Sequence, residues 1–242
     1  MILRGAAAAG VLALALLSVA GCDRGQRQAE AAAARAALAE DAAKQGEAAF
    51  EAAVADGNWS LAKAQGDVLL AQHPESDAAA RVAPQLAEVA AKADAQREQR
   101  RTAALWSYLV QPVDGGRQVS AAIYAKAQVD TDGSGPQPVR LIFRDHPDWG
   151  RSSYLVLERG DFACHGGCKV QVAVDADPPR AMAALRPETD EAIAMFINDE
   201  RALWQRIDGA KTLTVEFPVK PSGTRKATFE VAGLDRSQLP GW

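Results

Sequence analysis

Blocks of positive charge, long apolar runs and histidine are all scarce in this 242-residue chain, and each scarcity excludes a class of function. Lys and Arg number 27 against 31 Asp and Glu, and no block of basic residues stands out. The chain therefore lacks the electrostatic footprint of nucleic-acid binding, and we expect no nucleic-acid partner. After the N-terminal run, no second apolar stretch is long enough to span a membrane, which takes about 20 residues.

Metal ligands are equally few. The three histidines, His73, His146 and His165, lie in separate segments. A closed zinc site needs four ligands, so His165 with the two cysteines beside it does not complete one. We expect neither a metal nor another cofactor.

The N-terminus has the parts of an export signal. Arg4 supplies the positive charge, and residues 6–20 form an apolar run broken only by Gly10 and Ser18. The run ends in Val19-Ala20-Gly21-Cys22, which resembles the processing box of bacterial lipoproteins. That resemblance implies a signal peptide over residues 1–21 and a diacylglycerol on Cys22. The alternative is an ordinary secretory signal followed by an incidental cysteine.

A lipid on Cys22 implies attachment to the periplasmic face of a bacterial membrane, because two acyl chains are enough for stable anchoring. Asp23 resembles an inner-membrane retention signal, whereas Arg24 is not its usual companion. The sequence thus favours the inner membrane and leaves the outer membrane open.

The first half of the chain is rich in alanine, the strongest helix former. Residues 28–56 predict one helix, and residues 22–48 carry so few bulky apolar side chains that we expect an anchor and stalk there. Residues 49–105 should form a helical hairpin and a third helix. Ser76 can cap that helix, and Pro84 should kink it.

The hairpin has a recognisable pattern. Gly57 and Asn58 form a turn, Trp59 begins the second helix, Ala62 allows close approach, and Pro74 follows its end. This pattern resembles one tetratricopeptide repeat. Such repeats normally need about three copies to be stable, so a generic helical hairpin is the equal alternative.

From Trp106 the periodicity changes to alternation of apolar and polar residues, as in Val139, Leu141 and Phe143 with Arg140 and Arg144 between them. Alternation of this kind predicts half-buried antiparallel strands. Residues 106–242 should therefore form a β-sandwich-like domain with one helix, capped near Asp199, and the whole chain an α+β fold. Its end is similar to small β domains of bacterial envelope accessory proteins but shares no chemical motif with them.

Cys164-His165-Gly166-Gly167-Cys168 lies between two strand patterns, and we interpret it as the tip of a hairpin. In an oxidising envelope Cys164 and Cys168 should form a disulfide, since lipid occupies Cys22. A redox role is the alternative, although the spacing differs from the C-x-x-C of thioredoxin-like sites.

His146 lies between Asp145 and Asp148, with Ser152 and Ser153 close in sequence. These are the residue types of a hydrolytic triad, but neighbours on one loop cannot adopt its geometry. A turn between strands is the favoured interpretation, and we predict no catalytic residue.

Together these features predict a lipid-anchored envelope protein that works as a non-enzymatic binding or assembly module, with a membrane attachment and an envelope protein as partner. The alternative is an envelope enzyme or redox protein that uses His146 or the pair Cys164 and Cys168.

Overall fold

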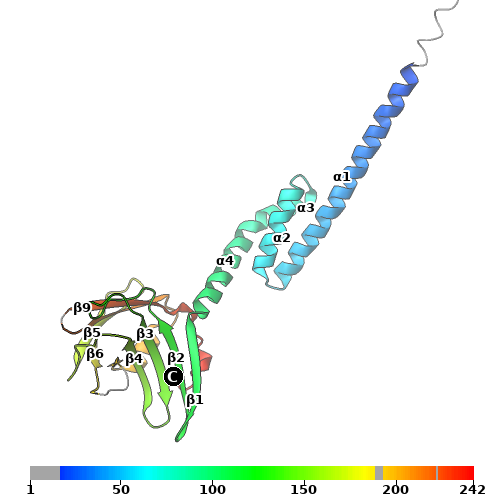
Figure 1. Ribbon diagram of the computed structural model, residues 1–242. Coiled ribbons are helices and arrows are strands. Elements are labelled where there is room, and N and C mark those ends of the chain that lie inside the picture. Colours follow the sequence, from blue (N-terminus) through cyan, green and yellow to red (C-terminus); the bar gives the residue numbers. More distant parts are fainter. Residues whose placement is uncertain (1–16, 189–192, 222) are drawn as a thin grey trace, which may run out of the picture. The chain divides into compact units, whose positions relative to one another are not determined.

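The computed structural model describes residues 17–188, 193–221 and 223–242, and for residues 17–23 the backbone alone. The fold is α+β, as expected: helices occupy the first part of the chain and an antiparallel sheet the second (Figure 1). The chain divides into two compact units between Gln96 and Arg97. Most of the expected signal peptide, residues 1–16, lies outside the described residues.

The first unit contains three helices and the beginning of a fourth. In chain order these elements are α1 (Leu17–Ala55), α2 (Trp59–Gln72), α3 (Asp77–Val82), a 3-10 turn (Ala83–Gln85) and α4 (Leu86–Ala103).

Small residues let the hairpin helices α1 and α2 approach closely. The Asn58 side chain caps α2 by accepting a hydrogen bond from the backbone N–H of Leu61 at 3.2 Å. Ala62 and Gly66 are both buried one turn apart. A Cβ added to Gly66 would lie 2.4 Å from a Leu86 methyl group and 3.3 Å from the Phe50 ring. The helical hairpin is confirmed, while its membership of the repeat family stays a prediction.

The expected third helix is interrupted. Ser76 caps α3 as predicted, since its Oγ accepts from the N–H of Ala79 at 3.1 Å. The 3-10 turn around Pro84 then separates α3 from α4. Proline has no N–H for the bond to the preceding turn, and its ring crowds that turn's carbonyl. The helix is therefore broken into two segments where the sequence predicted a kink.

The second unit is built on one sheet of nine antiparallel strands, in the order β1-β2-β3-β4-β7-β6-β5-β8-β9. The strands are β1 (Trp106–Val113), β2 (Gly116–Tyr124), β3 (Val139–His146), β4 (Gly150–Leu157), β5 (Cys168–Val174), β6 (Arg180–Leu185), β7 (Ile193–Ile197), β8 (Thr212–Pro218) and β9 (Thr224–Glu230).

The sheet curls so that its two halves enclose a single core (Figure 1). All nine strands contribute inward side chains to one buried cluster, among them Phe143, Leu155 and Phe217. Just after β2, the N–H of Lys126 donates to the carbonyl of Thr228 in β9 at 2.7 Å. The segment after β2 thus contacts β9, the edge strand at the opposite end of the sheet order. This contact gives the unit its sandwich-like form.

A short helix, α5 (Glu200–Arg206), covers part of this core. Asp199 caps it as predicted, accepting from the N–H of Ala202 at 3.1 Å. Its Trp204 packs against Phe143, with ring centroids 5.1 Å apart, and against Trp242, at 4.8 Å.

The structure corrects one expectation about the cysteine segment. It does not form a hairpin tip, because β4 and β5 are not neighbours: β7 and β6 lie between them in the sheet. Residues 158–167 instead cross from one half of the sheet to the other. An isolated bridge pairs Phe162 with Val219, next to the β8–β9 turn. Alternation reveals a strand but not which strand lies beside it, so adjacency in sequence was misleading here.

Candidate functional site

Cys22 is a residue of helix α1, and only its backbone belongs to the described part of the structure. Lipid attachment there stays a prediction. Where the chain is described, its helices all fall short of the combined length and apolarity that crossing a membrane requires.

Cys164 and Cys168 form a disulfide with their Cα atoms 5.0 Å apart. Cys164 is fully buried in the core and Cys168 is partly buried against it. The carbonyl of Cys164 accepts hydrogen bonds from the N–H groups of Gly167 and Arg186, both at 3.1 Å. The bridge therefore closes a tight turn that is also tied to the segment following β6.

Asp161 is the centre of a polar cluster beside this turn. Its carboxylate receives Nε of Arg186 at 2.9 Å, Nζ of Lys220 at 2.9 Å, and Nε2 of His165 at 3.1 Å. Burial by itself would raise the pKa of Asp161, but the hydrogen bonds from Lys220, His165 and Arg186 outweigh it and hold that pKa well below its ordinary value. His165, which the sequence offered as a candidate metal ligand, thus contacts the carboxylate of Asp161. The cluster around Asp161 holds the segment of residues 158–167 in place.

His146 is the last residue of β3 and is nearly buried. Its Nδ1 accepts from the N–H of Asp148 at 3.1 Å, and its ring stacks on Trp149 with centroids 3.9 Å apart. The prediction of a turn between strands holds for residues 147–149. His146 shapes this turn through its ring and Nδ1.

A larger feature is the outer face of six strands, which we call the arginine–aromatic face. The pairing registers place the following residues outward on one side of β1, β2, β3, β4, β7 and β6, with Trp149 in the adjoining turn: Leu109, Tyr124, Arg140, Ile142, Arg144, Ser152, Tyr154, Val156, Phe196 and Leu185. Four of its large side chains are strongly exposed: Trp149 by 68%, Tyr124 by 53%, Leu109 by 50% and Leu185 by 42%.

Arginine and aromatic rings are layered on this face. The Arg144 guanidinium lies 5.3 Å from the Tyr154 ring centre and 5.2 Å from that of Trp149. Arg140 lies 5.5 Å from the Tyr124 ring. The rings of Tyr154 and Phe196 are 4.9 Å apart. Cation–π attraction of this kind holds a guanidinium near the rings without neutralising its charge.

The charge on this face is of one sign. The outward positions of its six strands, which are described in full, carry two arginines and no Asp or Glu. Among the described residues, neither Arg140 nor Arg144 has a carboxylate at ion-pair distance. The other half of the sheet is ordinary by comparison, with the outward Glu216 paired to Lys226 at 3.8 Å.

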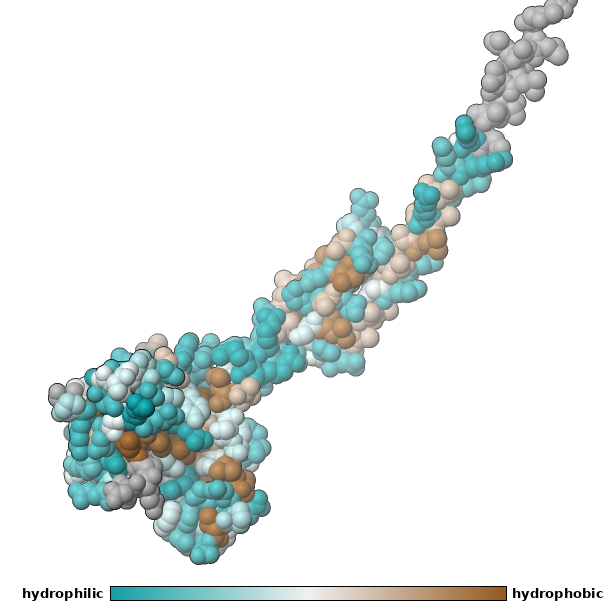
Figure 2. Space-filling model, viewed as in Figure 1, coloured by the Kyte–Doolittle hydropathy of each residue, from teal (hydrophilic) through white to brown (hydrophobic). Residues whose placement is uncertain are grey.

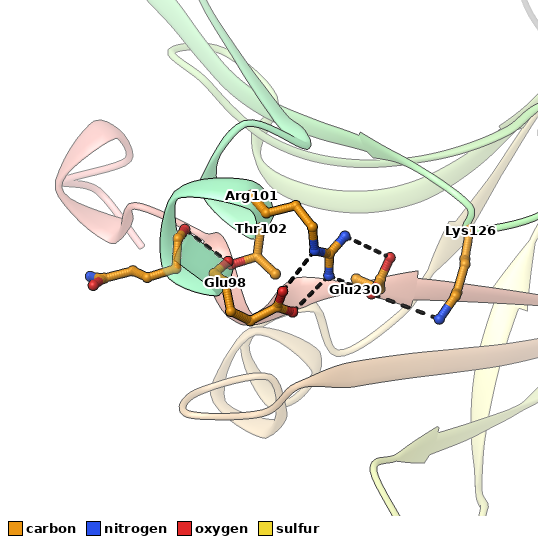
Figure 3. Close-up of polar contacts among 6 residues, drawn as sticks. Glu98, Arg101, Thr102, Lys126 and Glu230 are labelled. Carbon is orange, nitrogen blue, oxygen red and sulfur yellow. Dashed lines mark hydrogen bonds and ion pairs between the residues drawn. The ribbon is translucent and has the colours of Figure 1, made fainter. Parts of the chain in front are cut away.

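The end of α4 belongs to the second unit and is fastened to β9, as Figure 3 shows. Arg101 Nη2 lies 2.7 Å from a Glu98 oxygen and 2.7 Å from a Glu230 oxygen. Lys126 adds a longer contact to Glu230 at 3.8 Å. These contacts give a physical reason why the compact β unit begins at Arg97 and thus includes the last turns of α4, whereas the sequence placed a boundary at Trp106.

No protein-family model, no curated protein and no solved structure matches this chain. Within the described residues, no three His, Cys, Asp or Glu side chains come together in a way that could hold a metal ion.

Sequence reasoning did not single out the arginine–aromatic face. The alternation that marks Val139, Leu141 and Phe143 as inward does leave Arg140 and Arg144 outward. Alternation does not reveal the order of the strands in the sheet. That order brings Phe196 of β7 beside Tyr154, and Leu185 of β6 beside Phe196. Figure 2 shows hydrophobic residues in small patches over β1 and β2. The alternating pattern of these strands did not indicate that such patches would be exposed.

Proposed function

We propose that this chain is a lipid-anchored protein of the bacterial envelope that acts as a non-enzymatic binding or assembly module. The observation that carries the proposal is the arginine–aromatic face, where exposed rings lie next to two arginines and the outward strand positions hold no carboxylate. Exposed apolar area of this kind, next to polar groups, is typical of interaction surfaces. The processing box at Cys22 supports the membrane attachment.

The disulfide supports a binding role over a redox role. A catalytic dithiol needs an accessible sulfur that a partner thiolate can attack. Cys164 is buried in the core, Cys168 is partly covered by it, and the turn that contains both cysteines is tied to Arg186. We therefore assign the bridge a structural role in this proposal.

Site-specific photo-crosslinking in cells tests the binding role. A photoreactive amino acid replaces Leu185 or Tyr124 on the face, or Lys169 or Lys226 on the other half of the sheet as matched controls. We expect ultraviolet light to link the first two positions, and not the controls, to a discrete envelope component. Equal, diffuse labelling from all four positions would contradict a dedicated binding face.

A further inference from the structure

One row of residues crosses the arginine–aromatic face from strand to strand. The pairing registers align Ile142, Tyr154, Phe196 and Leu185 on β3, β4, β7 and β6, and the small, buried Ala122 of β2 continues the row at one end. Neighbouring strands lie about 4.8 Å apart, so the row is about 19 Å long. A helix rises about 1.5 Å per residue, so about 13 residues would cover the row.

The two arginines flank this row. Arg140 and Arg144 lie on β3 two residues before and two residues after Ile142. Four residues of strand span about 13 Å, which is close to the 10–12 Å diameter of a helix with its side chains. A helix lying along the row would therefore have one guanidinium on each side of it.

The charge of the flanks selects the partner. Neither guanidinium has a carboxylate partner among the described residues, and although the Nε atoms of Arg140 and Arg144 are buried, neither makes a hydrogen bond there. Both guanidiniums lie on aromatic rings, which leaves their charge available. Carboxylates are the natural complement, because a guanidinium binds them in two parallel hydrogen bonds.

We propose that this face binds a helix of about 13 residues from a partner protein, apolar on one side and carrying Asp or Glu along both flanks. The inference rests on the proposed binding role of the β unit and names its partner class. A helix fits better than an extended strand because it satisfies its own backbone hydrogen bonds while covering a sheet face, the usual layering of α+β folds. The apolar side covers the row, and the acidic flanks pair with Arg140 and Arg144.

Selection from a phage-displayed library of 14-residue helical peptides tests the proposal, with the purified full chain as bait. Counter-selection uses the double variant Arg140→Glu/Arg144→Glu. We expect enriched peptides with apolar residues at i, i+3, i+4 and i+7 and acidic residues on the flanks. Their affinity should fall at least tenfold on the double variant and remain unchanged on the matched control Lys169→Glu/Lys226→Glu.

A charge swap gives a readout that a merely structural role of the arginines would not move. Replacing the acidic residues of a selected peptide with Lys should restore binding to the Arg140→Glu/Arg144→Glu protein and abolish it on the wild type. Circular dichroism verifies that the variants are folded. If the charge reversal unfolds the chain, Arg140→Gln/Arg144→Gln replaces it, with a loss of at least fivefold expected.

Three results would overturn the inference. Enrichment could fail to exceed that on the charge-reversed bait, or the enriched peptides could be basic or extended. The face could also bind an acidic polysaccharide (alginate) or phosphatidylglycerol vesicles, with the same dependence on Arg140 and Arg144, and no helical peptide. In that last case face-specific crosslinks in cells would still support a binding module, so the two proposals fail separately.

Discussion

The guanidinium of Arg144 lies 5.3 Å from the ring centre of Tyr154, on the outer side of two paired strands. Burial raises the pKa of the Tyr154 hydroxyl, and the positive charges of Arg144 and Arg140 partly oppose this by favouring the phenolate. Replacing Arg144 with Gln should therefore raise the pKa of Tyr154 further. Carbon-13 NMR of the tyrosine ring as a function of pH measures it, with Lys226→Gln as the control. A fall in that pKa would mean that Arg144 does not lie over the ring.

The disulfide should contribute modestly to stability because it closes a very short loop. For a loop of about five residues the chain-entropy estimate is about 2 kcal/mol. We expect the double variant Cys164→Ser/Cys168→Ser to lose about that much free energy of unfolding in urea, with Cys22→Ser as the control. Unchanged stability, together with reduction of the bridge by mild thiol, would instead favour the redox alternative.

Asp161 should make the β unit sensitive to acid. Because its pKa is lowered in the folded state, its stabilising effect is fully present above the unfolded Asp value near 4 and is lost as the pH falls below it. At neutral pH, Asp161→Asn should cost about 2 kcal/mol, since it leaves the buried Arg186 without its carboxylate.

Urea unfolding of both proteins between pH 7 and pH 2 measures this linkage. The wild type should lose stability more steeply than Asp161→Asn below pH 4. Parallel curves would show that Asp161 is not held by its three partners.

Gly233 lies where the chain after β9 meets the end of α4. A Cβ added there would be 2.1 Å from the backbone carbon of Thr102, a contact that no rotamer can relieve. Gly233→Ala should therefore destabilise the β unit by about 1–3 kcal/mol. Thermal unfolding measures the change, and Ala232→Ser, at an exposed neighbour, serves as control. A neutral Gly233→Ala would argue against this close packing.

Local chemistry was readable from the sequence, and long-range pairing was not. The caps at Ser76 and Asp199 follow from short-range hydrogen bonding, and alternation revealed the inward side of β3. The pairing of Cys164 with Cys168 was predicted from their closeness in sequence and from the lipid expected on Cys22, and the structure contains that disulfide.

The strand order is set by how nine strands share one core, which no local pattern encodes. Sequence adjacency therefore misplaced the cysteine segment as a hairpin tip. For the same reason the sequence did not predict the row that contains Ile142, Phe196 and Leu185. These residues come from strands that are distant in sequence.

The most direct test of the binding face combines crosslinking with charge reversal in cells. A photoreactive residue at position 185 reports the yield of the face-specific crosslink in two backgrounds. With Arg140→Glu/Arg144→Glu we expect the yield to fall at least tenfold, and with the control pair Lys169→Glu/Lys226→Glu to stay at the wild-type level. Equal yields in both backgrounds would contradict the claim that the arginines of this face recognise its partner.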